Sequence, residues 1–439
     1  MSRQAIKHAE DLGRFVEESP SSYHAAAEAA RRLEEAGFQQ LGETTPWPNT
    51  TEQGSAHTRR FYVMRDGALM AWVIPTAVDP DALSFRMVGA HTDSPTFKLK
   101  PRPSTGTHTW WQVGVEVYGG PLLNSWLDRE LCLAGRITVR TDQGHETRLV
   151  ATGPVARIPQ LAIHLDREAN QGLTLNPQEH VQPIWGCGSS PGDVLELLGA
   201  HAAGGSVPAQ DILGWDVVLA DTQEARRFGA HGEFLACGRL DNLSSVHAGV
   251  NAIVEHAAAA ENTDSVAVFA AFDHEEVGSQ TRSGAGGPFA ETTMLRIGAA
   301  LGLTEQQQRM AWARSSVLSS DAGHLIHPNY RNHHDPNHQP VPGGGALLKI
   351  NANQRYATDA EGAAQWYLAC ERAGVSTQEF VSKNTVPCGS TIGPLTATRL
   401  GLRTVDVGVG LLSMHSAREM AHVQDLYALA AAVGQWWLG

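Results

Sequence analysis

A run of seven apolar residues, 266–272, constrains the fold of this chain more than any other stretch, because four candidate ligands, 273–276, follow it directly. A continuous apolar run of this length predicts a strand buried on both faces of a sheet. A second predicted strand, residues 83–90, ends at His91, whose ring is also a candidate ligand. Functional groups that follow buried strands indicate an α/β fold, a mixed sheet flanked by helices with its site at the strand ends.

Three helices are predicted beside this sheet. Residues 19–22 carry the Ser and Pro signals of a helix start, and the helix is expected to run over 23–36 and to end at Gly37. Residues 244–260 predict a second helix. Residues 416–438 predict an amphipathic third helix, whose final Trp436 and Trp437 we expect to be buried in the core or at a subunit contact.

The stretch from 96 to 235 has a different pattern. Its short alternating runs, such as 112–118 and 131–140, are broken by Gly, Pro and Asn, which is typical of β-structure. It contains none of the candidate metal motifs, which resume directly after it. We therefore predict a discontinuous catalytic domain, residues 1–95 and 236–439, with an inserted β-rich domain, residues 96–235, that serves as an oligomerisation or lid domain.

Composition excludes several classes of function. The formal net charge of -13 and the absence of a Lys/Arg run disfavour nucleic acid as a partner. The chain has no apolar signal core and no stretch near the roughly 20 apolar residues of a membrane span. Five widely spaced cysteines without a Cys-x-x-Cys pair suit a reducing compartment. These features predict a cytoplasmic protein that does not associate with membranes.

Five short strings scattered along the chain each supply a His or an acidic residue. His and carboxylate ligands suit zinc, and a carboxylate shared between two ions offsets their mutual repulsion. Five ligands with one shared would hold two Zn²⁺ ions per subunit, and Mn²⁺ or Co²⁺ could occupy one of the two positions. The candidate ligands are His91, Asp241, the pair Glu275 and Glu276, Asp321, and His415.

The adjacent acids Glu275 and Glu276 suggest a division of labour. Neighbouring side chains in a regular strand point to opposite faces, so one carboxylate can bind metal while the other faces water. Water activated between two metals becomes a nucleophile near neutral pH, and a free carboxylate can move its proton to the leaving amine. Asp93, two residues after His91, is expected to accept a hydrogen bond from the imidazole and to fix its tautomer.

Each string alone has a simpler interpretation. A lone His-x-Asp is common, Asp241 or Asp321 alone would be a turn or cap residue, and a lone His415 would be a partly buried histidine. Only their combination predicts a metal centre. A further group of histidines predicts an exposed loop more than a second metal site, although its first two members are expected to face the cleft: His324, His327, His333, His334 and His338.

With these residues in order, the chain resembles the aspartyl aminopeptidase family of dinuclear zinc peptidases nearly end to end. The strings that carry the resemblance are residues 19–38, 89–95, 112–120, 126–131, 158–165, 239–242, 273–279, 320–330, 354–357, 389–394 and 414–419.

The resemblance implies a role for each matching residue. His91, Asp241 and Asp321 would hold one metal; Asp241, Glu276 and His415 would hold the other; and Glu275 would be the general base and acid. His164 would reach an active site, that of a neighbouring subunit, within a tetrahedral dodecamer. Lys349 would bind the substrate, which the family implies is a peptide with an acidic N-terminal residue. His324 is a further candidate for substrate binding because it follows Asp321 closely and is expected to face the cleft.

Two departures from the family pattern are visible. Gln160 replaces an expected His, and residues 410–413, beside His415, differ enough to reshape the substrate pocket. These departures make the acidic preference less secure than the metal chemistry. From the resemblance we expect an aminopeptidase that prefers Asp or Glu. The alternatives are a dinuclear amidohydrolase or an aminopeptidase of neutral or broader specificity, and a non-catalytic assembly protein stiffened by metal. The last is disfavoured because a structural zinc site needs no proton shuttle such as Glu275.

Overall fold

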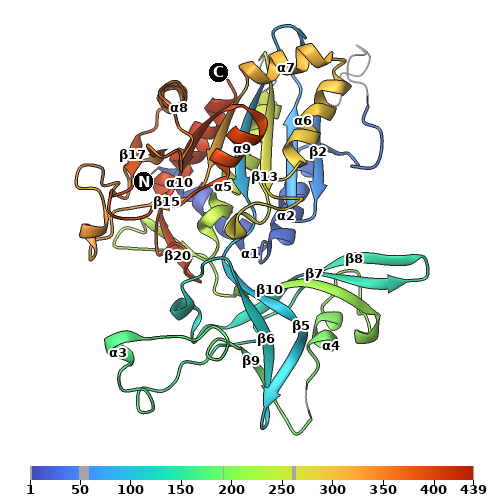
Figure 1. The fold of residues 1–439 in the computed structure, drawn as a ribbon, viewed down its shortest axis with the longest axis vertical. Helices are drawn as coiled ribbons and strands as arrows, with labels where there is room; N and C mark the ends of the chain where they lie inside the picture. Colours follow the sequence, from blue (N-terminus) through green and yellow to red (C-terminus); the bar gives the residue numbers. More distant parts are fainter. Residues whose placement is uncertain (1, 49–58, 191, 260–263, 439) are drawn as a thin grey trace.

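The computed structural model describes residues 2–48, 59–190, 192–259 and 264–438, and it contains two lobes (Figure 1). The first lobe is a nine-stranded mixed sheet between two layers of helices, as the sequence predicts. Among the described residues, none of the helices is long and apolar enough to cross a membrane. The strands of the sheet are, in spatial order, β1 (Gln39–Gln40), β2 (Arg60–Arg65), β3 (Ala68–Val73), β13 (Ser265–Phe272), β4 (Ser84–His91), β14 (Ser316–Ser320), β18 (Arg403–Gly408), β16 (Ala346–Ile350) and β17 (Thr377–Val381).

The apolar run of β13 lies at the centre of this sheet and is buried along its whole length. Its odd-numbered residues, such as Phe269, pack into one hydrophobic core and its even-numbered residues, such as Val268, into the other. This two-sided burial is what the unbroken apolar pattern predicts. Trp436 and Trp437 are buried in the core that contains Phe269, which decides between the two uses predicted for them.

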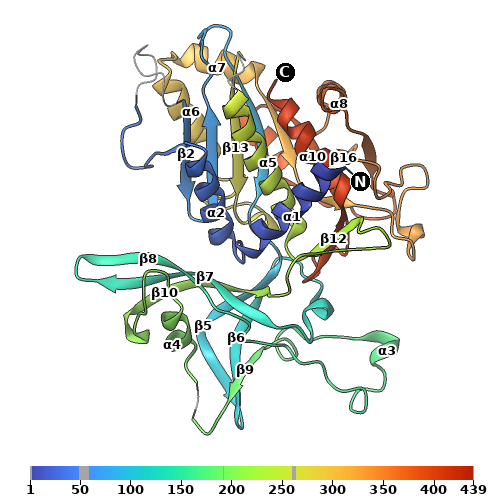
Figure 2. The same ribbon diagram turned by 180° about the vertical axis from the view of Figure 1, so that it is seen from behind.

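Helices cover both faces of the sheet. Figure 1 shows α6, α7 and α9 on one face, and Figure 2 shows α1, α2, α5 and α10 on the other. Ser21 caps α2, as predicted, by accepting from the His24 backbone N–H. The helices are α1 (Arg3–Glu17), α2 (Ser22–Glu35), α5 (Leu240–Ala259), α6 (Phe289–Ala300), α7 (Glu305–Arg314), α8 (Ala360–Ala373), α9 (Ile392–Leu400) and α10 (Val423–Trp436).

Two predicted helix boundaries differ from the structure. The last helix, α10, begins at Val423 and not at residue 416, because residues 419–422 form strand β20 (Glu419–His422) and pair with two other strands. Helix α5 is bounded by Leu240, but Asp241 and Asn242 have non-helical backbone angles, and the peptide bond between them is cis. The regular part of α5 therefore follows Asn242, close to the predicted start at residue 244. Ala260, the predicted end of that helix, lies outside the described residues.

The second lobe is built on a six-stranded antiparallel sheet, whose strands all lie between residues 96 and 221. Figure 1 shows this lobe below the helix-covered sheet. The elements are, in spatial order, β8 (Gly144–Ala151), β7 (Leu131–Thr141), β10 (Ile212–Asp221), β5 (Thr96–Thr107), β6 (Trp110–Tyr118) and β9 (Ile184–Cys187), with helices α3 (Ala169–Gly172) and α4 (Val194–Ala200).

A small third sheet crosses the predicted domain boundary at residue 235. Strand β11 (Arg226–Phe228) pairs with β12 (Phe234–Cys237), and β12 pairs with β20. The sheet continues with β19 (Gly410–Leu412) and β15 (Gly323–His324). Sheet membership therefore places the chain after residue 221 with the first lobe. The predicted division at 95/96 and 235/236 stays a prediction.

Candidate metal centre

Three parallel strands of the first lobe carry the candidate ligands to one edge of the sheet. β4 pairs in parallel with both β13 and β14, and Phe272 at the end of β13 is in register with His91 at the end of β4. Asp321 follows β14 directly, and residues 273–276 follow β13. Because the carboxyl ends of parallel strands share an edge, these side chains meet there, as the sequence predicts.

Five of the predicted ligands form two overlapping groups whose ligand atoms lie within 4.8 Å of one another. His91, Asp241 and Asp321 form one group, and Asp241, Glu276 and His415 form the other. The His91 Nε2 atom lies 3.4 Å from Asp241 Oδ1, and the His415 Nε2 atom lies 3.4 Å from Asp241 Oδ2. Asp241 thus presents one oxygen to each group, the geometry that a shared carboxylate requires.

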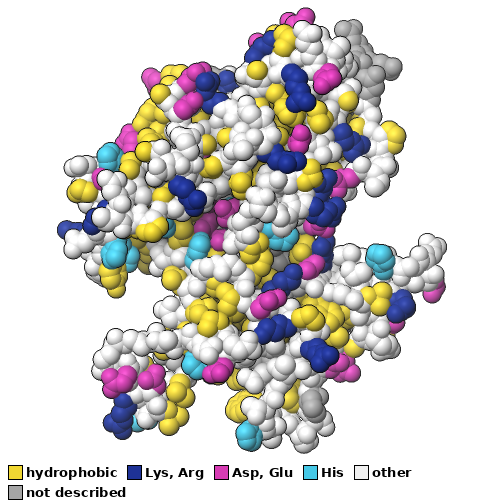
Figure 3. Space-filling model, in the orientation of Figure 1, with side chains coloured by type: hydrophobic (Ala, Val, Ile, Leu, Met, Phe, Trp, Pro, Cys, Tyr) yellow, Lys and Arg dark blue, Asp and Glu magenta, His cyan; other side chains and the backbone are white. Residues whose placement is uncertain are grey.

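The electrostatics of these groups fit bound cations. Among the described residues, none donates a hydrogen bond to Asp241 Oδ1 or Glu276 Oε1, although both atoms are buried. Burial alone would lower the pKa of His91, but the carboxylates of Asp241, Asp321 and Asp93 around its ring raise it well above its ordinary value. A buried cluster in which carboxylates outnumber cations is costly unless positive charge enters it. Figure 3 shows acidic side chains in a hollow above the second lobe, with histidine nearby.

Asp93 supports this centre in a way the sequence predicts only in part. The His91 Nδ1 atom lies 3.0 Å from the Asp93 backbone carbonyl and 3.4 Å from its carboxylate, so the backbone oxygen is the closer acceptor. The carboxylate mainly accepts from the backbone N–H groups of Glu275 and Glu276, both at 3.0 Å, and from the Tyr118 hydroxyl at 2.8 Å. Burial raises the pKa of Asp93, yet its hydrogen bonds from His91 and Tyr118 bring the pKa below its ordinary value.

The acidic pair lies in a turn, which corrects the strand geometry expected from the sequence. β13 ends at Phe272, His274 has a left-handed backbone with φ of 64°, and Glu275–Val277 form a 3-10 turn. Both carboxylates reach the same region, because ligand atoms of Glu275, Glu276 and His91 lie within 4.8 Å of one another. Burial, together with nearby Asp321, Asp93 and Asp241, raises the pKa of Glu275 to about 8.

Glu419 is a contributor that the sequence reasoning missed. Its carboxylate is 2% exposed and accepts from the backbone N–H of Asp241 at 2.9 Å and from that of His415 at 2.7 Å. It therefore fixes the backbone of two candidate ligands from β20. Its only sequence signal is an acid four residues after His415, which is too common a spacing to identify alone.

The predicted substrate residues lie in different surroundings. The Lys349 side chain is 1% exposed, and its ammonium donates to the Ala322 carbonyl at 3.0 Å and lies 3.5 Å from Asp321 Oδ2. His324 is exposed, with its ring 5.9 Å from that of Phe380. His164 is exposed in the segment before α3, and Figure 1 shows α3 at the left side of the second lobe.

The loop histidines form no further candidate metal group among the described residues. His327 and His333 pack against the exposed ring of Tyr330, with centroid distances of 4.8 Å and 6.1 Å. His338 pairs with Asp335 at 2.9 Å. The structure therefore agrees with the prediction of a largely exposed loop, in which His327 is half-buried.

Comparison with known proteins identifies the family. Residues 15–436 match the model of the aminopeptidase I zinc metalloprotease family, M18. A probable M18 family aminopeptidase 2 of Streptomyces avermitilis is 49% identical over 427 residues, which cover 96% of each chain.

Solved structures agree. A chain in the cryo-EM structure of the Ape4 and Nbr1 complex has a TM-score of 0.93 and 33% identity over 99% of this chain and 86% of that one. The S. cerevisiae mApe1 dodecamer has a TM-score of 0.84 and 28% identity over 97% and 95% of the two chains. This chain belongs to the M18 family of zinc metalloproteases. It is a metallo-aminopeptidase, a hydrolase of peptide bonds.

Proposed function

We propose that this enzyme removes the N-terminal residue, preferably Asp or Glu, from peptides by means of two metal ions and the carboxylate of Glu275. The observation that carries the proposal is the position of Asp241 between the two ligand groups, with Glu275 remaining outside both of them. His91, Asp241 and Asp321 would hold one ion, and Asp241, Glu276 and His415 the other. Zinc is the family's metal, and Mn²⁺ or Co²⁺ would be accepted at one position.

Bound zinc supplies Lewis-acid activation of the scissile carbonyl and of a water molecule. Glu275 accepts a proton from the attacking water on a carboxylate oxygen and passes it to the leaving nitrogen, so that the amine departs neutral. A pKa held near the working pH suits a group that must first accept and then donate a proton, and burial raises that of Glu275. Asp93 holds the backbone of the turn while the proton moves.

The preference for an acidic substrate rests on Lys349 and His324. Lys349 places a buried positive charge beside Asp321, and His324 offers an exposed ring next to that of Phe380. One observation favours the second candidate, an aminopeptidase of neutral or broader specificity or a related amidohydrolase. The Lys349 ammonium already has two oxygen partners within its protein environment, which limits direct contact with a substrate carboxylate.

We further propose a homo-oligomer, with the tetrahedral dodecamer of the family as its form. The support is that mApe1 forms a dodecamer and that His164 lies among three exposed apolar side chains, Leu161, Ile163 and Leu165. In such an assembly His164 would reach the active site of a neighbouring copy. A cytoplasmic location stays a prediction from cysteine usage.

The test is turnover of aspartyl, glutamyl, leucyl and lysyl substrates and of N-acyl amino acids, before and after chelation and metal add-back. Glu275→Gln is expected to abolish turnover while two metal ions per chain are retained. The control is Glu255→Gln, an exposed position on α5. Near-normal turnover by Glu275→Gln would refute the mechanism, and faster cleavage of leucyl than glutamyl substrates would favour the second candidate.

A further inference from the structure

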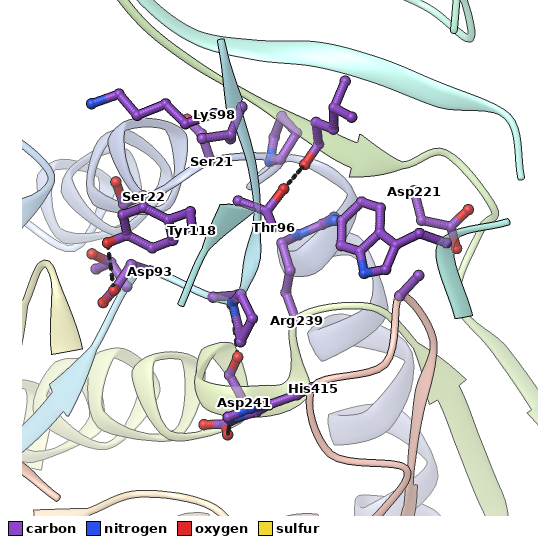
Figure 4. A pocket seen from close by; sticks show the side chains of 18 of the residues that line it. Ser21, Ser22, Asp93, Thr96, Lys98, Tyr118, Asp221, Arg239, Asp241 and His415 are labelled. Carbon is purple, nitrogen blue, oxygen red and sulfur yellow. Dashed lines mark hydrogen bonds and ion pairs between the residues drawn. The ribbon is translucent and has the colours of Figure 1, made fainter. Parts of the chain in front are cut away.

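The end of β6 in the second lobe reaches directly into the surroundings of the metal centre. Tyr118 is the last residue of β6, and its hydroxyl donates to Asp93 Oδ2 at 2.8 Å, the contact drawn as a dashed line in Figure 4. Two residues later the Gly120 carbonyl lies 3.0 Å from His415 Nδ1. Residues 118–120, which we call the β6 strap, thus contact both Asp93, which supports the Glu275–Glu276 turn, and the candidate ligand His415.

On one side the β6 strap acts through Asp93. The two carboxylate oxygens of Asp93 accept the backbone N–H groups of Glu275 and Glu276, one each, and Oδ2 also accepts the Tyr118 hydroxyl. Asp93 is 4% exposed, so these hydrogen bonds lie out of contact with bulk water. The rotation of this carboxylate, and with it the position of the turn, depends on a hydroxyl from the other lobe.

On the other side the β6 strap holds His415. The ring donates from Nδ1 to the Gly120 carbonyl, which leaves Nε2 to face Asp241 and Glu276. The His415 backbone carbonyl accepts from Leu122 N–H at 2.9 Å. His415 has a φ of 65°, an unfavourable angle for a residue with a side chain, so its loop needs such outside support.

The β6 strap also approaches the turn closely. A Cβ atom on Gly119 would lie 3.1 Å from the Glu276 Cβ and 3.3 Å from its carbonyl oxygen, and Gly119 has a φ of 70°. Only a residue without a side chain allows this approach without displacing Glu276. Backbone, hydroxyl and close packing therefore all join the β6 strap to the centre.

We propose that the β6 strap is a positioning element of the catalytic centre, with Tyr118 setting the Glu275–Glu276 turn through Asp93 and Gly120 orienting His415. The inference rests on the proposed function, since it assigns to Tyr118 and Gly120 the support of residues given roles there. It means that the second lobe is part of the active site within a single chain. A displacement of that lobe would move the proton-transfer group and one ligand together.

The test is Tyr118→Phe, which deletes one hydroxyl and keeps the ring. The control is Tyr427→Phe, which deletes a hydroxyl bonded to Gln4 at 3.0 Å, away from the centre. In zinc-saturated enzyme we expect kcat of Tyr118→Phe to fall 10- to 100-fold with KM changed less than threefold, the size seen for groups that orient metal-site residues. Because Tyr118 acts through Asp93, the double variant Tyr118→Phe/Asp93→Asn should be no slower than Asp93→Asn alone.

Unchanged kcat in Tyr118→Phe, or factors that multiply in the double variant, would overturn the proposal. If Tyr118→Phe does not fold, Gly119→Ala decides: a fall in kcat with intact zinc content supports the proposal, and unchanged kcat overturns it. Glu275→Gln is measured in the same assay. An active Glu275→Gln removes the proposed function itself, whereas an inactive Glu275→Gln beside a fully active Tyr118→Phe removes only the role of the β6 strap.

Discussion

Replacing Lys349 with Met tests whether burial or distance decides the strength of an ion pair in this protein. The Lys349 ammonium lies 3.5 Å from Asp321 Oδ2, and its side chain is 1% exposed. At that separation and an effective dielectric constant of about 20, the attraction is about 5 kcal/mol. Loss of one partner of a buried pair typically costs about 3–5 kcal/mol. In Lys349→Met, His91 still faces the Asp321 carboxylate at 3.3 Å. We therefore expect the free energy of unfolding to fall by an amount at the lower end of that range, about 3 kcal/mol.

The matched control is Lys98→Met. Lys98 lies only 2.8 Å from Asp216, a shorter pair, but both side chains are 32% exposed and water screens them. Such a pair contributes about 0–1 kcal/mol. The assay is urea unfolding of the chelated variants at equal protein concentration, with the free energy of unfolding compared to that of the parent. If Lys98→Met lowers that free energy as much as Lys349→Met does, the reasoning from burial is refuted.

Three further predictions follow from the same structure. Burial raises the pKa of Glu275 to about 8, and bound cations will lower that pKa. Because a general base must be deprotonated to act, kcat should fall with decreasing pH, with a midpoint between the ordinary pKa of 4.5 and 8. A pH profile of kcat that stays flat down to pH 4.5 would contradict this. Chelation should abolish turnover and lower the midpoint of thermal unfolding, because the carboxylates of Asp241, Glu276 and Asp321 would then repel one another. Added zinc should restore both the turnover and the midpoint. Calorimetry with an activity assay measures this, and an unfolding midpoint insensitive to chelation counts against the metal centre. Trp437→Ala should lower the free energy of unfolding by about 3–5 kcal/mol, since Trp437 is fully buried and donates a hydrogen bond to the Arg86 carbonyl. Trp110→Ala, at a side chain that is 51% exposed, should change that free energy by about 0.5 kcal/mol or less. Urea titration compares the two variants, and equal losses would contradict the burial argument.

Much of the first lobe could be predicted because its signals are local. The apolar run of β13 requires two covered faces wherever it lies, and Ser21 caps α2 through its own neighbours. The start of α10 could not be predicted in this way. Residues 419–422 have a sequence compatible with helix, and pairing with β19 and with β12, which is far away in the chain, makes them a strand.

The residues of the candidate site also divide into those with a signal in the sequence and those that only the fold reveals. The chemistry of a metal limits which side chains can bind it, so His91, Asp241, Asp321, His415 and the pair of Glu275 and Glu276 could be named as candidates. The family resemblance selected Glu276 from that pair, and the structure brings the five predicted ligands together. The supporting groups carry no such signature. Glu419, Tyr118 and the Gly120 carbonyl act through ordinary hydrogen bonds to backbone or to another carboxylate, so they become visible only when the fold places them.

The order in which the chain leaves the ribosome has a consequence for this architecture. The second lobe closes its sheet within residues 96–221, so it can fold while synthesis continues. The catalytic sheet, in contrast, needs β18 (Arg403–Gly408), and α1 packs against α10 (Val423–Trp436), so its parts are widely separated in the sequence. The candidate ligands span residues 91 to 415. The metal site can therefore be assembled only once the chain through residue 415 has been synthesised, so a shorter nascent chain lacks a complete set of ligands.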